Sequence, residues 1–392
     1  MPVLESTEDL LPFRDPDYRA NPYPFYDRIH EAGGVYRHPM GIWIVTRHDL
    51  ITPLLRDRSL SVREIDFGPA SPLHDSMLGQ DPPDHTRLRR ATNAWLNPEA
   101  VERWSGVVQE KCHGLLESAS SRESFDAVHD LAYPLTHATM CHILGVPFDG
   151  STDVREKTFE FGLSLGPGAD DDDLAMTAAA AEWFEGYIRG LIAQKRQAPG
   201  DGMLDHLLAA HGAGDLTEAE VIATTFLFFA VGHLDVSYLI VNGLRLMAEH
   251  PEVLRAYREE PELRPQIINE ILRFDTPEQF VTRQTTTTLS VGDVEIPAGE
   301  LVLLMIGAAN KDAAVFVDPH RFDVRRPAGG KSHLAFGGGM HGCAGQILAR
   351  AEAHVVFTAV SSLYPGLRAA GEPTWGHTEF IRALHALPLS LR

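Results

Sequence analysis

The residues from Phe336 to Gly345 read Phe-Gly-Gly-Gly-Met-His-Gly-Cys-Ala-Gly and combine one cysteine with five glycines. Glycine lets a backbone lie close to a flat group and adopt φ values that other residues avoid. Cys343 stands directly before a helix expected over residues 345–363, whose N-terminal amides and positive dipole end would stabilise a thiolate. Such a thiolate suits the axial position of a haem iron, as a soft anionic ligand.

Two other roles for Cys343 stay open when the residues are taken alone. A buried thiol is the most common state of cysteine in cytosolic proteins. A nucleophile activated by His341 would need the two side chains to face each other, and a separation of two residues does not by itself produce that geometry.

Charged pairs recur elsewhere at helical spacing. Glu270 and Arg273 are three residues apart, and His85 and Arg89 are four apart, so each pair shares one face of its expected helix. Pattern alone favours solvated surface charges that contribute little to stability.

The elements that must position these residues are mostly helices. Apolar periodicity and capping signals predict helices over 21–30, 85–96, 98–118, 131–144, 174–196, 217–249, 252–259, 263–273 and 345–363. Short strands are expected at 35–36, 42–46, 284–289, 294–295 and 301–306, and residues 61–84 are expected to form a long loop. The sequence therefore predicts a mainly α fold with small β-sheets, in a single domain over residues 1–392.

Two acidic features are assigned to helix starts. The run Asp170–Asp173 precedes an alanine-rich helix, where carboxylates compensate the helix dipole, and this interpretation is preferred to a calcium site. Thr217 and Glu220 have the spacing of a capping box at the start of the longest helix.

Composition excludes several classes of protein. With 34 Lys+Arg against 54 Asp+Glu, the net charge of −20 argues against nucleic-acid binding, which needs a basic surface. The three cysteines are too few for a disulfide framework. Glu5, Glu8 and Asp9 are unlike a signal peptide, and the apolar run 301–309 is shorter than the ~20 residues of a membrane span. A cytoplasmic protein without a membrane partner is expected.

The pattern Phe336-x-x-Gly339-x-His341-x-Cys343-x-Gly345 resembles the haem-binding signature of the cytochrome P450 family. Glu270-Ile-Leu-Arg273 resembles the E-x-x-R helix of that family, and Asp318-Pro-His-Arg321-Phe resembles the segment that supplies a third member of its network. The segment from Asp81 to Arg90 resembles the helix that faces the haem in bacterial members. The resemblance extends from about Asn21 to the C-terminus and implies a cytochrome P450 fold, with the long central helix over haem b.

The resemblance also implies roles for individual residues. Cys343 would be the axial iron ligand, and Glu270, Arg273 and Arg321 would form a buried network that holds the cysteine loop. The remaining haem contacts implied are the propionate partners His85, Arg89, Arg283 and His333 and the loop residues Phe336, Gly339 and His341. Arg87, Arg90 and Arg350 are candidates for a basic patch that docks an acidic ferredoxin.

The long helix departs from the family pattern. The family has an acid and a threonine two and three residues after a glycine, and this pair helps to deliver protons to iron-bound oxygen. Counting from Gly232 places Leu234 at the acid position and Asp235 at the threonine position. Asp235 is therefore the candidate proton relay. A π-bulge that brings Asp235 and Ser237 into another register is a second possibility.

The resemblance implies a monooxygenase that activates O₂ with electrons from NAD(P)H, delivered by a ferredoxin and a ferredoxin reductase. The substrate would be a small organic molecule, either a free natural product or one tethered to a carrier protein. Residues implied to line its pocket are Phe229, His233, Leu234, Phe280, Val281, Phe380 and Ile381, with the loop 61–80. The alternatives are a peroxide-using or redox-neutral haem-thiolate enzyme and a haem- or ligand-binding protein without turnover.

Overall fold

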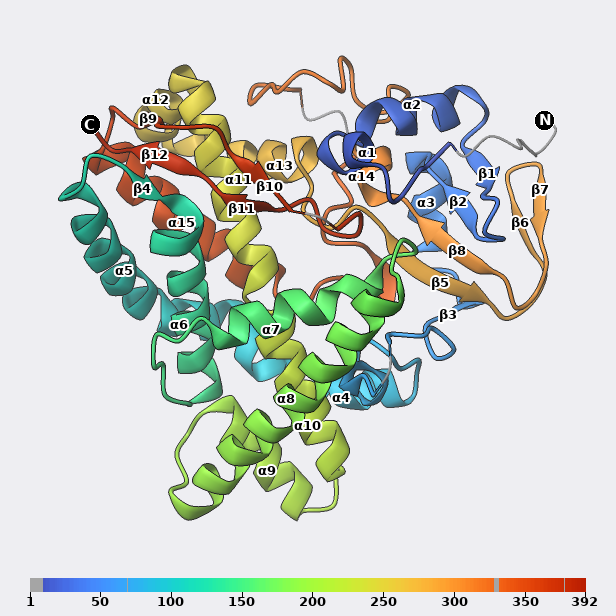
Figure 1. Ribbon diagram of the computed structural model, residues 1–392, viewed down its shortest axis with the longest axis horizontal. Coiled ribbons are helices and arrows are strands. Elements are labelled where there is room, and N and C mark those ends of the chain that lie inside the picture. Colours follow the sequence, from blue (N-terminus) through green and yellow to red (C-terminus); the bar gives the residue numbers. More distant parts are fainter. Residues whose placement is uncertain (1–9, 69, 328–330, 377) are drawn as a thin grey trace. The chain divides into compact units, whose positions relative to one another are not determined.

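The computed structural model describes residues 10–68, 70–327, 331–376 and 378–392 (Figure 1). Glu5, Glu8 and Asp9, on which the signal-peptide expectation rests, lie outside the described residues. The chain forms two compact units. The first unit comprises Met1–Ile65, Glu262–Cys343 and Trp375–Ala383, and the second comprises Asp66–Pro261, Ala344–Thr374 and Leu384–Arg392.

The first unit is built on a five-stranded sheet with the order β1-β2-β8-β5-β3. Its strands are β1 (Val35–Arg37), β2 (Trp43–Val45), β3 (Leu60–Ser61), β5 (Val281–Thr285) and β8 (Leu301–Leu304). β2 and β8 are parallel, with Trp43 opposite Val302, whereas the other neighbours are antiparallel. β6 (Leu289–Val291) and β7 (Val294–Ile296) form a separate antiparallel pair.

Both faces of this sheet are covered, because alternate residues of a strand point to opposite sides. Val302 and Leu304 of β8 lie in one hydrophobic cluster, and Leu303 lies in another with Tyr26. The helices of this unit are α1 (Pro16–Ala20), α2 (Tyr23–Glu31), α3 (His48–Leu54), α13 (Arg264–Phe274) and α14 (Ile306–Ala309), with 3₁₀ turns at Pro261–Leu263 and Gly339–His341.

The second unit is mainly helical. Its α-helices are α4 (Asp84–Leu96), α5 (Pro98–Ser120), α6 (Tyr133–Leu144), α7 (Asp153–Gly162), α8 (Asp171–Gln197), α9 (Met203–Gly212), α10 (Glu218–Ala230), α11 (Leu234–Glu249), α12 (Pro251–Glu259) and α15 (Gln346–Leu363). Within this unit α15 packs against α5, α11 and α12 (Figure 1). A π-helical segment, Ala127–Ala132, leads into α6, and 3₁₀ turns occur at Pro72–Asp75 and Leu163–Leu165.

Short strands complete the fold. β4 (Phe125–Asp126), β12 (Pro388–Ser390) and β9 (Arg368–Ala369) form a three-stranded sheet in that order, and β10 (Thr374–Trp375) pairs with β11 (Leu384–Ala386). Most helices expected from the sequence are present within a few residues of their predicted bounds. The strand expected over 284–289 is wrong, because residues 286–288 separate β5 from β6.

The long helix expected over 217–249 is also wrong in one respect, because it is interrupted between α10 and α11. The amide of Gly232 is shared between the carbonyls of Leu227 (3.3 Å) and Phe228 (3.1 Å), so a π-type hydrogen bond accompanies the α-type one. The segment Glu218–Glu249 is long and apolar enough to cross a membrane, but 83% of its most apolar stretch is buried inside the protein, as in a core helix.

The expected helix starts are confirmed. The Asp170 carboxylate caps α8 and accepts hydrogen bonds from the amides of Asp172 (3.1 Å) and Asp173 (3.0 Å). The Asp173 carboxylate in turn accepts a hydrogen bond from the Asp170 amide. Thr217 and Glu220 form the capping box of α10. These carboxylates therefore satisfy backbone amides at helix N-termini.

Glu352 of α15 is a buried carboxyl that makes stability depend on pH. Burial raises its pKa to about 8 from 4.5, with the Thr139 hydroxyl opposing the shift. Between these two pKa values the folded chain keeps a proton that the unfolded chain has lost. The free energy of unfolding therefore falls as the pH rises from 4.5 to about 8, by up to about 1.4 kcal/mol per pH unit. Glu352→Gln should be more stable than the wild type at pH 9 and show no gain at pH 4.5, in urea unfolding at both pH values. Exposed Glu110→Gln is the control, and an equal gain at both pH values would contradict the assignment.

Candidate functional site

The cysteine loop is closed by backbone hydrogen bonds within the first unit. The amide of Cys343 donates to the carbonyl of Phe336 at 2.9 Å, and the amide of Gly342 donates to the carbonyl of Gly339 at 3.2 Å. Gly339 has a φ of +67°, and a Cβ at this position would collide with the carbonyl oxygen of Leu55. A glycine is therefore required there, which explains why the loop can be so compact. His341 ends the 3₁₀ turn Gly339–His341.

Cys343 differs from the other two cysteines in its surroundings. It is exposed, whereas Cys112 and Cys141 are buried. Burial raises the pKa of each buried thiol to about 12, so both stay protonated at neutral pH. A metal needs the thiolate, and Cys343 is the cysteine whose position suits that role.

The predicted Glu270–Arg273 pair is buried and bidentate. Arg273 Nε and Nη2 each donate to a Glu270 carboxylate oxygen at 2.8 Å, and both side chains are 5% exposed or less. Arg273 Nη1 also donates to the carbonyls of Asn310 and Pro319, both at 2.9 Å. The pair is therefore a structural centre of the first unit rather than a solvated surface pair.

The third side chain of this network is Arg326, which corrects the assignment of Arg321. Arg326 Nε lies 3.4 Å from a Glu270 carboxylate oxygen. Arg321 is exposed and contributes only its carbonyl, which accepts from Arg273 Nη2 at 3.2 Å and from Arg326 Nη2 at 2.9 Å. The physical reason is the turn closed by the Arg321 amide on the Asp318 carbonyl, with Asp318 at a φ of +47°, which leaves the Arg321 side chain in solvent.

The candidate propionate partners are distributed over both units. In the second unit, His85 of α4 is buried, and its pKa is lowered by burial and then by the charge of Arg89. In the first unit, Arg283 of β5 is 9% exposed and donates to the carbonyl of Thr282. His333 Nε2 lies 3.2 Å from Asn269 Oδ1, so a propionate would have to replace that amide.

Asp235 and Ser237 lie in the first turn of α11 in the second unit. The Ser237 hydroxyl donates to the carbonyl of Leu234 at 2.7 Å and is buried. Asp235 is half-buried, and its charge helps to raise the pKa of Tyr238. Asp235 thus has the more accessible side chain, whereas the Ser237 hydroxyl is engaged by the helix backbone.

The predicted pocket residues of the second unit are buried. Phe229, His233 and Leu234 are 0%, 0% and 5% exposed. The ring of Phe229 contacts Tyr187 of α8 with centroids 5.7 Å apart, and the ring of His233 lies 5.3 Å from that of His137. Phe229 therefore packs against α8 and His233 against α6.

In the first unit, Phe280 belongs to a hydrophobic cluster and packs against Phe380 with ring centroids 5.3 Å apart. Val281 and Ile381 are partly exposed, and Ile381 forms a β-bridge with Glu278. Burial raises the pKa of Glu278 to about 7, with Arg283 opposing. The sequence analysis did not single out Glu278, although it directly precedes the predicted pocket segment.

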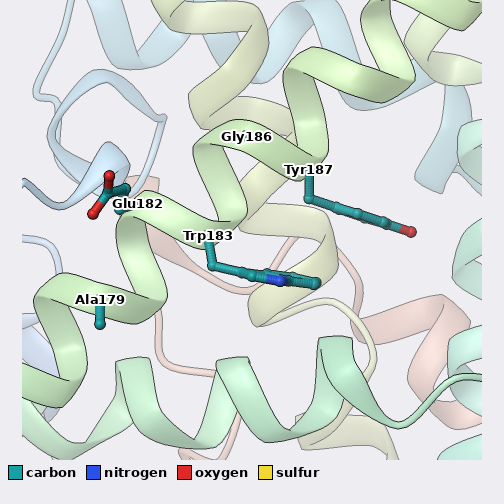
Figure 2. Close-up of a pocket in the computed structure, with 5 residues that line it drawn as sticks. All are labelled: Ala179, Glu182, Trp183, Gly186 and Tyr187. Carbon is teal, nitrogen blue, oxygen red and sulfur yellow. The ribbon is translucent and has the colours of Figure 1, made fainter.

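A separate hollow of about 500 Å³ lies on α8 in the second unit and is lined by Ala179, Glu182, Trp183, Gly186 and Tyr187 (Figure 2). Trp183 and Tyr187 project side by side, with their rings stacked at 5.0 Å and 10°. None of the residues that line it was among the predicted pocket residues.

The cationic patch expected from Arg87, Arg90 and Arg350 is smaller than predicted. Arg87 bridges α4 to the start of α10, with Nη2 2.5 Å from Glu220 Oε1 and 3.3 Å from Asp84 Oδ1. Arg90 is exposed. The charge of Arg87 is therefore compensated within the unit.

An exposed cysteine in a glycine-rich loop, a buried Glu–Arg network in the same unit and a helix interrupted next to a carboxylate indicate the class of haem-thiolate proteins. Comparisons with known proteins agree. The cytochrome P450 family model matches residues 172–362. Cytochrome P450 107B1 of Saccharopolyspora erythraea is 34% identical, with 97% of each chain covered.

Two solved structures extend the comparison. P450BioI, in complex with a hexadec-9Z-enoic acid-ligated acyl carrier protein, has a TM-score of 0.89 and 29% identity, with 96% of this chain and 100% of that chain covered. The tirandamycin C-bound P450 monooxygenase TamI has a TM-score of 0.86 and 31% identity, with coverages of 96% and 99%.

The chain belongs to the cytochrome P450 family and is a cytochrome P450 monooxygenase. Members of this family bind haem through a cysteine thiolate. The residues of this chain fit such a cofactor, because the loop offers an exposed cysteine and a glycine at Gly339 where a Cβ cannot be accommodated.

Proposed function

We propose that Cys343 ligates the haem iron, and that this chain hydroxylates, epoxidises or oxidatively couples a small natural product in the cytoplasm. The observation that carries the proposal is the exposure of Cys343 in its closed loop, in contrast to the two buried thiols. Thiolate-ligated haem supplies oxygen activation, since thiolate donation favours cleavage of the O–O bond. We propose further that Phe336, Gly339 and His341 shape the cofactor side of the loop.

The side chains of His85, Arg89, Arg283 and His333 are proposed to bind the haem propionates. Hydrogen bonds from charged donors to carboxylates are short and strong. His85 supports this role, because burial and Arg89 disfavour its protonated form until an anion is near. Val281 and Ile381, which are partly exposed, are the best-supported contacts for substrate in the first unit.

Electrons are proposed to come from NAD(P)H through a ferredoxin and a ferredoxin reductase. Arg90 and Arg350 remain the candidate docking cations, since Arg87 is engaged by Glu220. The substrate is proposed to be a natural product, free or carried by an acyl carrier protein. This setting is supported by the likeness to TamI and to P450BioI, whose structures contain such molecules.

A ferric Soret titration tests the substrate class. The purified protein is titrated with small natural products, with fatty acids and with the same fatty acids tethered to an acyl carrier protein. A saturable shift to high spin with one class identifies it. A thiolate-haem spectrum with turnover supported by peroxide but not by ferredoxin would favour the peroxide-using alternative instead.

Asp235 is proposed to relay protons, and Asp235→Asn should increase the peroxide released per O₂ consumed. An amide cannot act as the general acid, whose contribution is roughly 10²–10⁴-fold in rate. Ser237→Ala is the matched control. The Ser237 hydroxyl already donates to the carbonyl of Leu234, so its removal should change the ratio of peroxide to O₂ little. Oxygen electrode and peroxide assays give the ratio, and an unchanged value for Asp235→Asn would exclude the relay.

A further inference from the structure

Three polar rings meet at the helix interruption in the second unit. Tyr133 and His137 come from α6, and His233 comes from the turn between α10 and α11. Ring centroids are 5.4 Å apart for Tyr133 and His137, 5.4 Å for Tyr133 and His233, and 5.3 Å for the two histidines. All three side chains are buried. The proposed function assigns no role to this cluster.

His137 is held by a contact with Tyr133. Tyr133 Oη lies 3.3 Å from His137 Nδ1, a hydrogen bond that either tautomer of the ring can form. Burial raises the pKa of Tyr133 far above neutrality, so its hydroxyl keeps its proton. His137 is neutral at pH 7, since burial lowers its pKa to about 4. One nitrogen of this ring therefore carries a proton and the other is bare.

Three imidazole nitrogens in this cluster have no partner with hydrogen-bond geometry in the described part of the chain. They are His137 Nε2 and both ring nitrogens of His233. The pKa of His233 is lowered by burial and by His137, with the Phe229 carbonyl opposing, so this ring is also neutral. Each neutral ring carries one N–H donor and one bare nitrogen, and His137 Nδ1 is already engaged by Tyr133. Ordered water is the usual partner of such buried groups.

His233 lies two residues before the candidate relay Asp235. The carbonyl of His233 accepts the amide of Ser237 at 3.1 Å, so His233 and Asp235 belong to the same first turn of α11. The Arg155 guanidinium lies 5.5 Å from the Tyr133 ring centroid, and its charge disfavours a cation on His233. The charge of Asp149 opposes the lowering of the His137 pKa. The charge of Asp235 raises the pKa of Tyr238, and the charge of Arg155 lowers it. His137 and His233 therefore both favour their neutral forms.

We propose that His137 and His233 bind ordered water at the start of α11 and conduct protons through it toward Asp235, an inference that rests on the proposed function. In the transfer the neutral ring of His233 takes a proton from water on its bare nitrogen and releases the proton of its other nitrogen to the next water, while His137 Nε2 holds the water. One proton moves, no electron moves and the ring remains neutral. The histidines are positioning residues, because they act through water and Asp235.

The test compares O₂ reduction without substrate, with NADPH, spinach ferredoxin and spinach ferredoxin reductase as the electron source. Each variant is first confirmed to carry thiolate-ligated haem. In His233→Leu and His137→Leu, the rate of O₂ reduction to water should fall by ~10-fold or more, because general acid–base catalysis contributes roughly 10²–10⁴-fold. His233→Gln, which keeps one donor and one acceptor, should restore part of the rate.

Thermal unfolding separates proton conduction from packing. The leucine variants should keep or raise the unfolding midpoint, because they remove buried polar groups without partners. Met140→Leu is the matched control, since the Met140 side chain packs at Gly232 and carries no exchangeable proton. Its water-forming rate should match that of the wild type.

Three results would overturn the inference while leaving the proposed function intact. The first is an unchanged rate of water formation in the leucine variants of the histidines. The second is a loss of rate and of unfolding midpoint in Met140→Leu as large as that in the histidine variants. The third is a high-resolution crystal structure of the wild type with no water on the three nitrogens. Ordered water on these nitrogens would support the inference without reference to activity. A wild type that lacks thiolate-ligated haem or reduces no O₂ would instead contradict the proposed function.

Discussion

Replacing Cys343 with alanine should abolish the thiolate-ligated haem spectrum completely. Cys343 is the exposed cysteine, and its loop is closed by the hydrogen bond from its amide to the Phe336 carbonyl, which the substitution leaves intact. The loss is therefore expected in the ligand and not in the fold. The measurement is the ferrous–CO difference spectrum, together with haem content per chain and the far-UV circular dichroism of the variant.

Cys112→Ala is the control for this experiment. The Cys112 thiol is buried, and burial raises its pKa to about 12, so it offers no thiolate to a metal at neutral pH. The variant should keep the thiolate spectrum of the wild type. A thiolate spectrum retained in Cys343→Ala would disprove the assignment of the ligand.

Glu270→Ala should destabilise the first unit by about 3–5 kcal/mol, the range for removing one member of a buried ion pair. The Arg273 guanidinium would remain 2% exposed without its carboxylate, and Arg326 and the amide of Asp323 would lose the same acceptor. We expect little haem-loaded protein, because the network lies in the unit that carries the cysteine loop. Urea unfolding and haem content measure the two effects, and normal values for both would contradict the role of the network.

Two arginine variants distinguish the members of this network. Arg326→Ala removes a guanidinium beside Glu270 and should cost about 1.5–3 kcal/mol, as expected for hydrogen bonds to charged groups. Arg321→Ala leaves its carbonyl in place and removes only an exposed side chain, so its effect should stay within about 0.5 kcal/mol. The reverse order of stabilities would restore the assignment made from the sequence.

Local chemistry was predictable from the sequence, because the residues involved are close along the chain. The cysteine loop, the Glu270–Arg273 pair and the caps at Asp170 and Thr217 are each contained within ten residues. Their geometry depends on glycine conformation, helical spacing and side-chain hydrogen bonds to nearby amides. None of these requires knowledge of how distant segments meet.

The features that were missed depend on contacts between distant segments or on a break in an otherwise continuous helical pattern. Arg326 contacts Glu270 across 56 residues of sequence, and His137 meets His233 only when α6 packs beside the helix interruption. The interruption itself is hidden in the sequence, because buried apolar residues stand on both sides of it, at Phe229 and Ala230 and at Leu234. Periodicity reports burial and gives no sign of a shared hydrogen bond at Gly232.

The parallel pairing of β2 with β8 delays completion of the five-stranded sheet while the protein is being synthesised. Val45 lies opposite Leu304, so more than 250 residues must leave the ribosome after β2 before its partner strand exists. At roughly 5–20 residues per second this takes on the order of 10–50 s. Throughout that interval the edge of β2 is exposed, while most of the helical unit, which is continuous from Asp66 to Pro261, is already available to fold. The loop of Cys343 is made later still, and the unpaired edge of β2 stays open to other strands until β8 has left the ribosome.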